Sequence, residues 1–193
     1  MLKRTAAGAA LTVAAMLVLT GCSGPTNGQN NHENMPGMGA SQSADVPANQ
    51  ADIMFAAMMI PHHEQAIEMA DMLLAKDGID PQVTALAERI KAAQGPEIEL
   101  MQQWLDEWGV DEMPESMDHG GMMGDGDMDA LEQASGAEAE RLFLEGMIVH
   151  HEGAIEMAED ELADGENQDA LDLANDIIEA QSTEISEMQG MLK

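Results

Sequence analysis

Residues 59–70 read Met59-Ile60-Pro61-His62-His63-Glu64-Gln65-Ala66-Ile67-Glu68-Met69-Ala70. Nearly the same string returns, at an offset of 88 residues, as Met147-Ile148-Val149-His150-His151-Glu152-Gly153-Ala154-Ile155-Glu156-Met157-Ala158. The match continues downstream, where 86–101 pairs with 173–188 at an offset of 87. A repeat of this length indicates an internal duplication, so the chain is expected to contain two copies of one supersecondary unit.

Each copy carries the start and stop signals of a helical hairpin. A first helix is expected over about 52–76, followed by a short turn and a second helix. Gly after the first helix, and Asp or Asn capping the second, mark the turn in both copies. These signals are Asp77-Gly78 and Asp80-Pro81 in the first copy, and Asp164-Gly165 and Asn167 in the second. Two such hairpins predict an all-α fold, an antiparallel four-helix bundle.

Composition restricts the possible functions. The chain has 193 residues, enough for one domain with tails. Asp and Glu number 37 against 7 Lys and Arg, a formal net charge of −30. Nucleic-acid binding is therefore excluded, because phosphate backbones require clustered cations. The single Cys excludes an internal disulfide and a cysteine-based metal cage, whereas Met is unusually frequent, with 19 residues.

The N-terminal segment has the features of an export signal. A positively charged start precedes an apolar run at 6–19 that is too short to span a membrane. The run ends in Leu19-Thr20-Gly21-Cys22, which resembles the lipoprotein box of bacteria. We therefore expect a signal peptide at 1–21, a lipid on Cys22 and an extracytoplasmic protein anchored to the cell membrane. An ordinary signal peptide with an incidental Cys is the alternative.

Two polar segments divide the rest of the chain. Residues 22–50 are rich in Gly, Asn, Ser, Gln and Pro, which predicts a flexible tether. The four-helix bundle is expected over 51–193, with a Met- and Gly-rich linker at 109–129.

Helical periodicity directs the repeated polar residues inward. On the first helix Met59, His62 and His63 share the apolar face, and Glu64 lies on the opposite, solvated face. On the second helix Glu97 shares the apolar face and lies about as far from the turn as the two His, so all four residues should be level. The second copy repeats the arrangement. The eight inward-facing groups are Met59, His62, His63, Glu97, Met147, His150, His151 and Glu184.

This constellation has a structural and a metal-binding interpretation. Buried His and Glu can simply hydrogen-bond each other and fix the register of the bundle. Di-iron bundles place Glu three residues before His, but Met59 and Met147 occupy that position here. A thioether in place of a carboxylate shifts the preference from iron toward copper. Glu97 and Glu184 keep a mixed His/carboxylate site for iron or manganese open.

Met and His also gather in the polar segments, where apolar packing does not call for them. Flexible Met/His clusters suit Cu(I), which accepts two to four soft ligands in loose geometry. Low-complexity drift is the alternative explanation. The candidates are Met35, Met38, Met117, His119, Met122 and Met123.

The paired Met-Ile-x-His-His blocks resemble the bacterial exported family catalogued as domain of unknown function 305, over about 50–193. The resemblance implies a ferritin-like four-helix bundle. It also implies extracytoplasmic copper binding through Met and His, since some members are periplasmic copper-binding proteins. Carried onto this chain, the implied ligands are Met59, His62, His63, Met147, His150 and His151.

Three functional hypotheses follow. The first is a lipid-anchored copper-binding protein that buffers, sequesters or delivers copper, with Cu(I) favoured and a copper-transfer protein as a possible partner. The second is a redox enzyme with a dinuclear His/Glu site for iron or manganese. The third is an acidic interaction module without a metal. The sequence carries no nucleophile constellation or phosphate loop, so an enzyme is the less favoured interpretation.

Overall fold

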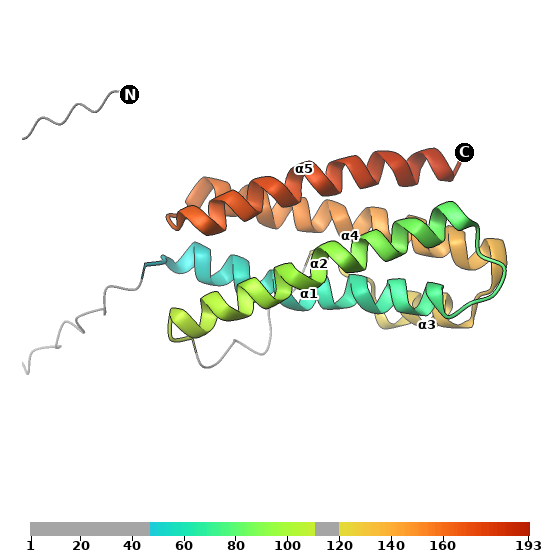
Figure 1. The fold of residues 1–193 in the computed structure, drawn as a ribbon, viewed down its shortest axis with the longest axis horizontal. Helices are drawn as coiled ribbons and strands as arrows, with labels where there is room; N and C mark the ends of the chain where they lie inside the picture. Colours follow the sequence, from blue (N-terminus) through green and yellow to red (C-terminus); the bar gives the residue numbers. More distant parts are fainter. Residues whose placement is uncertain (1–46, 111–119) are drawn as a thin grey trace, which may run out of the picture. The chain divides into compact units, whose positions relative to one another are not determined.

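The computed structural model describes residues 47–110 and 120–193, and the expectations for 1–46 and 111–119 lie outside it. The described residues form five helices and no strand, so the expected all-α fold is confirmed (Figure 1). The helices are α1 (Gln50–Leu74), α2 (Pro81–Glu107), α3 (Asp125–Gln133), α4 (Gly136–Asp164) and α5 (Gln168–Met191).

Local signals set the helix ends. Asn49 forms a capping box with Asp52 at the start of α1, two residues before the expected start. The side chain of Asp80 accepts a hydrogen bond from the backbone N–H of Gln82, with Pro81 at the first position of α2. Asn167 caps α5 in the same way through the N–H of Ala170. The sequence-predicted caps of α2 and α5 are therefore confirmed.

Two helical hairpins pack side by side in antiparallel fashion. α1 packs against α2, α4 packs against α5, and α1 and α4 join the hairpins (Figure 1). The amide of Asn49 donates to the carbonyl of Asp164 at 2.7 Å, which places the start of α1 beside the end of α4. On the other side, Arg89 of α2 lies 2.6 Å from Glu187 of α5.

The segment expected as a linker is partly structured. α3 begins within it, extends beyond it to Gln133, and packs against α1 and α4. The side chain of Gln65 donates to the carbonyl of Met123 at 3.0 Å and accepts from its N–H at 2.8 Å. Gly153 permits a further close approach, because a Cβ there would lie 2.4 Å from the carbonyl oxygen of Gly120. Sequence periodicity missed α3 because it is short and rich in Gly and Asp at its start.

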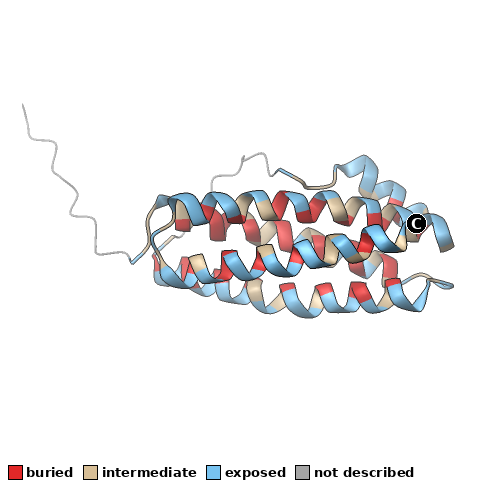
Figure 2. Cartoon of the chain, turned by 90° about the horizontal axis from the view of Figure 1, so that it is seen from above, coloured by how far each residue is buried: buried red, intermediate tan, exposed pale blue. Residues whose placement is uncertain are grey.

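The core consists of two apolar clusters on the inner helix faces (Figure 2). One contains Met59, Met101 and Trp104, and the other contains Met147 and Met188. Each fully buried side chain of this size stabilises the fold by about 1.5–3 kcal/mol. The four histidines of the repeats belong to neither apolar cluster and are also buried.

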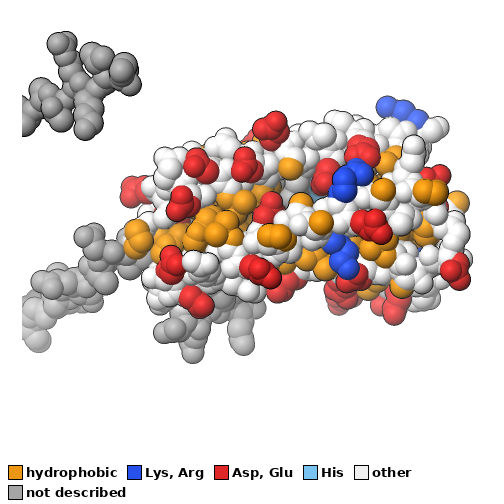
Figure 3. Space-filling view, viewed as in Figure 1, with side chains coloured by type: hydrophobic (Ala, Val, Ile, Leu, Met, Phe, Trp, Pro, Cys, Tyr) orange, Lys and Arg blue, Asp and Glu red, His pale blue; other side chains and the backbone are white. Residues whose placement is uncertain are grey.

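On the face shown in Figure 3, acidic side chains are spread over the surface and basic side chains are few. Within the described ranges, no helix is both long enough and apolar enough to cross a membrane.

Candidate metal centre

The four histidines form a polar layer in the middle of the bundle. His62 and His63 come from α1 and His150 and His151 from α4, and all four side chains are completely buried. Neighbouring helix residues diverge by about 100°, so each doublet spreads across the inner face of its helix. The inward orientation expected from the sequence is confirmed, as is the exposure of Glu64.

At the centre of the layer the two repeats meet. The rings of His62 and His150 lie 3.6 Å apart between centroids, with their planes inclined by 37°. Burial, together with repulsion from the neighbouring His62, His151 and His63, lowers the pKa of His150 to about 2. His150 is therefore a neutral imidazole at physiological pH, which is the form that binds a metal.

The two outer histidines are each held by a carboxylate. Nε2 of His63 lies 2.7 Å from Oε2 of Glu97, and Nε2 of His151 lies 2.7 Å from Oε2 of Glu184. A carboxylate only accepts, so Nε2 carries the hydrogen, and in the neutral imidazole Nδ1 then carries the lone pair. The predicted level of the Glu residues is thus confirmed, and each is the hydrogen-bond partner of a histidine.

Several buried polar atoms in or beside the layer have no hydrogen-bond partner among the described residues, and four of them belong to the outer histidines and to two glutamines. They are Nδ1 of His63, Nδ1 of His151, Oε1 of Gln94 and Oε1 of Gln181. Gln94 and Gln181 are equivalent in the two repeats and are 2% and 3% exposed. Their inward edge position was visible in the helical periodicity, but their full burial was not. A buried acceptor without a partner either binds a ligand or lowers the stability of the fold by the free energy of burying an unpaired polar atom.

Sulfur lies close in sequence to both doublets. Met59 and Met147, three residues before the first His of each doublet, are completely buried. Met59 belongs to one apolar cluster and Met147 to the other, so thioethers from both repeats enter the core. In the described part of the chain, no three His, Cys, Asp or Glu side chains are grouped to hold a metal. A site in the layer would therefore need thioether ligands or some rearrangement.

Of the remaining predicted ligands the structure describes Met122 and Met123, which lie away from the layer. Met122 and Met123 line a cavity on the outer side of α4 with Leu142 and Gly146. Met123 also packs against an apolar cluster. The expectation that apolar packing does not explain the Met residues of the linker is therefore wrong for Met123. Its backbone is held by Gln65, which orders the side chain. Met35, Met38, Met117, His119 and Cys22 lie outside the described residues.

Sequence reasoning missed a pair of buried acids at the end of the bundle. Asp52 is completely buried and Glu161 is 1% exposed. Burial alone would raise the pKa of Asp52, but hydrogen bonds from the N–H groups of Asn167 and Asn49 bring it below its ordinary 3.8. Burial raises the pKa of Glu161 to about 8, and the neighbouring Asp52 contributes to the increase. The capping box could have indicated Asp52, whereas no pattern in the sequence singled out Glu161.

Comparison with known proteins places this arrangement in a family. The family model described as domain of unknown function 305 matches residues 52–192. The chain belongs to the domain of unknown function 305 family. The resemblance drawn from the His-His blocks is thus confirmed. Among curated proteins, none matches the chain.

Solved structures of this family share the fold. A Streptomyces coelicolor member, named as a candidate secreted protein, is 32% identical with a TM-score of 0.69, over 74% of this chain and 90% of its own. A fragment from Deinococcus radiodurans is 30% identical with a TM-score of 0.69, over 76% and 97%. CopM in its Cu(I)-bound form is 35% identical with a TM-score of 0.61, over 72% and 94%. CopM has also been solved with Cu(II), with silver and without metal.

Proposed function

We propose that this member of the domain of unknown function 305 family is an extracytoplasmic copper-binding protein that buffers, sequesters or hands on copper, with Cu(I) as the favoured ion. The bundle site uses His62, His63, His150 and His151 with thioether sulfur from Met59 and Met147. Copper is cargo in this proposal, and no chemical step on it is required.

The observation that carries the proposal is the pair of oriented histidines. A metal-binding His donates its second ring nitrogen to a carboxylate, which fixes its tautomer and orientation. His63 and His151 are held in this way, and each keeps a buried Nδ1 without a partner among the described residues. Glu97 and Glu184 then act as positioning residues, not as ligands.

The donor set supports a soft metal. Imidazole suits copper, and thioether selects Cu(I) over iron and manganese. Both donor types are completely buried in both repeats, away from water. The relative CopM, solved with Cu(I), Cu(II) and silver, is 35% identical in its Cu(I) form.

We further propose that the chain works outside the cytoplasm, tethered by a lipid on Cys22. The support is the Leu19-Thr20-Gly21-Cys22 box after the apolar run, together with the Streptomyces relative named as a candidate secreted protein. In the same proposal Met35, Met38, Met117, His119, Met122 and Met123 supply additional Cu(I) ligands. A copper-transfer protein would take the metal from them.

The alternative is a ferritin-like bundle with a dinuclear iron or manganese redox site. Such sites need carboxylates that bind or bridge two metals. Glu97 and Glu184 would have to release their histidines first, since each is hydrogen-bonded to one. An acidic interaction module without a metal is the third possibility. In that case Nδ1 of His63 and of His151 would stay unpaired and lower the stability of the fold.

The test is a competitive Cu(I) titration of residues 23–193, which include the whole compact unit 42–193. The bundle variant carries His63→Asn and His151→Asn, which keep a polar side chain in the layer. The matched control carries His32→Asn and His119→Asn, which change the two histidines of the chain that lie outside the bundle repeats.

We expect the bundle variant to lose its tightest copper and the control to keep it. Equal affinity in the two variants would reject the bundle site. Co-purified iron or manganese with turnover of oxygen or peroxide would favour the enzyme, and absence of any tight metal would favour the interaction module.

A further inference from the structure

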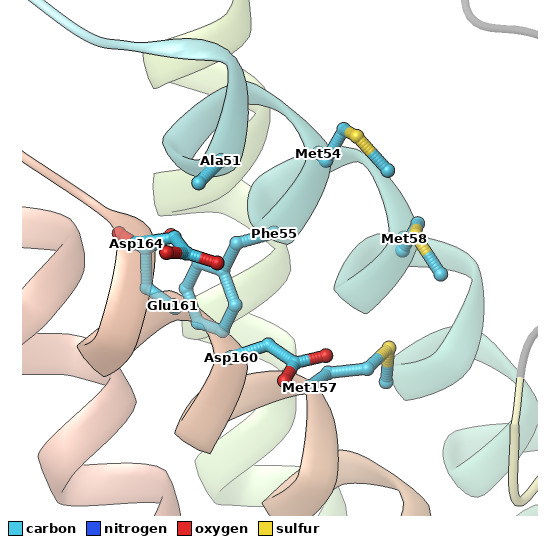
Figure 4. Close-up of a pocket in the computed structure, with 8 residues that line it drawn as sticks. All are labelled: Ala51, Met54, Phe55, Met58, Met157, Asp160, Glu161 and Asp164. Atoms are coloured by element: carbon cyan, nitrogen blue, oxygen red, sulfur yellow. The ribbon is translucent and has the colours of Figure 1, made fainter.

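A second cavity with metal-binding chemistry lies where α1 begins and α4 ends (Figure 4). It measures about 270 Å³. Met54 and Met58 line it from α1, and Met157 lines it from α4. Met157 is six residues beyond His151, or about 9 Å along the helix. The cavity therefore shares no residue with the His layer.

The three thioethers are accessible, unlike those of the core. Met54, Met58 and Met157 are partly exposed, whereas Met59 and Met147 are completely buried. The exposed carboxylates of Asp160 and Asp164 also line the cavity. Negative charge at the rim of a cavity raises the local concentration of cations without selecting among them.

A buried carboxyl group completes the wall. Glu161 lines the cavity and is 1% exposed, and no donor among the described residues reaches either of its oxygens. The neighbouring Asp52 cannot supply a hydrogen, because its carboxylate already accepts from the N–H groups of Glu166 and Asn167. Burial, and then the neighbouring Asp52, raise the pKa of Glu161 to about 8, so a proton on Glu161 satisfies the pair at neutral pH. A cation could take the place of that proton.

The internal duplication provides a control for this end of the bundle. The position equivalent to Glu161 in the first repeat is Leu73, which is completely buried. The position equivalent to Met58 is Gly146, and a Cβ there would lie 2.6 Å from the sulfur of Met123. At that end the linker fills the space. The fold therefore does not require a buried acid or an accessible thioether at these positions.

We propose that this cavity is a second binding site for a soft monovalent cation, Cu(I) or Ag(I). The thioethers of Met54, Met58 and Met157 are the ligands, and the Glu161 carboxylate balances the charge. On binding, Glu161 releases one proton to solvent and no electron moves. Two to four soft ligands suffice for such an ion, whereas Ca²⁺ or Mg²⁺ would need about six or more oxygen ligands. The site shares the metal of the proposed function but none of its residues, so either can fail alone.

The first experiment counts Ag(I) bound to residues 23–193 by native mass spectrometry and calorimetry. The test variant is Met54→Leu/Met58→Leu/Met157→Leu, since Leu keeps nearly the volume of Met. The control is Met72→Leu/Met128→Leu/Met191→Leu, at three partly exposed positions outside the cavity. The His layer is intact in both variants.

We expect the test variant to bind one fewer Ag(I), or to bind that equivalent at least tenfold more weakly, while the control matches the wild type. Equal stoichiometry and affinity in all three proteins would overturn the proposal. If the His63/His151 variant loses bound metal and the Met54/Met58/Met157 variant does not, the proposed function stands and the second site is rejected.

The second experiment follows the Met methyl groups by NMR during addition of Ag(I). We expect the methyl signals of Met54, Met58 and Met157 to shift together and to saturate at one equivalent. Signals that stay in place would overturn the ligand assignment. In Glu161→Gln the same three signals should saturate only at a higher Ag(I) concentration, and unchanged binding there would remove Glu161 from the site.

Discussion

The hydrogen bonds of Glu97 and Glu184 decide which nitrogen of His63 and His151 is free to bind. Each His donates Nε2–H to its carboxylate, so the lone pair on Nδ1 stays inside the bundle. The carboxylates are 24% and 18% exposed, whereas both imidazoles are completely buried. A change at the carboxylate therefore alters the orientation of the imidazole without opening the core.

Replacing both carboxylates by amides tests this role. Because a Gln side chain can donate as well as accept, Glu97→Gln/Glu184→Gln should no longer fix one tautomer. We expect Cu(I) affinity to fall by about 10–100-fold, as is typical when the partner of a metal-binding His is lost. Competitive titration measures the effect, with Glu99→Gln on the exposed side of α2 as the control. An unchanged affinity would mean that the carboxylates serve only the apo fold.

The buried acid at the bundle end should make stability depend on pH. Glu161 has a pKa of about 8 in the folded protein and about 4.5 when unfolded. The folded state holds the extra proton, so this contribution is complete below pH 4.5 and is lost as the pH rises through 8. In urea titrations from pH 6 to 9, the wild type should lose stability relative to Glu161→Gln. Parallel curves would contradict the assignment.

His150 acts in the opposite direction at lower pH. Its pKa is about 2 in the folded protein against 6.5 when unfolded, so the unfolded state binds the extra proton between these values. Stability should therefore fall as the pH drops below 6.5, by about 1.4 kcal/mol per pH unit for one such group. The comparison of Glu161→Gln with Glu161→Gln/His150→Asn between pH 5 and 7 isolates the slope. If the free energy of unfolding fell more steeply with decreasing pH in the double variant, the lowered pKa of His150 would be contradicted.

At the scale of elements, the sequence predicted most of the framework. The caps Asp80 and Asn167 and the level of Glu97 with His63 follow from local chemistry and helical rise, and the structure agrees. α3 and the docking of Met123 were not predictable in this way. Both depend on a contact between Gln65 and a segment 58 residues away, and local periodicity contains no information on such contacts. Glu161 was hidden for a related reason, because its neighbour Asp52 is distant in sequence and belongs to another helix.

The docking of the linker should be sensitive to one methyl group. Gly153→Ala places a Cβ against backbone atoms of Gly120 and Gly121, which no side-chain rotation can relieve. We expect a loss of about 1–3 kcal/mol in the free energy of unfolding, as for overpacked sites. Gly190→Ala is the matched helical control, with open space around its Cβ, and should be neutral or stabilising by up to about 1 kcal/mol. Chemical denaturation of both variants would decide, and equal effects would contradict the close approach.

For the whole molecule, charge repulsion opposes compaction. The chain carries a net charge of −30 on 193 residues, with 37 acidic and 7 basic residues, and the face in Figure 3 has few basic side chains. Salt screens such repulsion, with a Debye length of about 10 Å at 0.1 M. We expect the Tm to rise by a few degrees between 20 and 200 mM NaCl, measured by calorimetry in the absence of metals. A falling Tm would show that attractive ion pairs outweigh the repulsion.

The unequal residues at repeat positions 65 and 153 also bear on how the chain could have arisen. A dimer of two identical first repeats would carry Gln at both equivalent positions, and so would lack the glycine that the second repeat has at Gly153. A side chain at that position would collide with the backbone of Gly120 and Gly121, which lies against Gly153. The seat for Gly120 and Gly121 therefore exists in the second half alone among the described residues, and the two halves are not interchangeable. A tandem of two first repeats would keep the His layer and lose the fixed route of the chain between its halves.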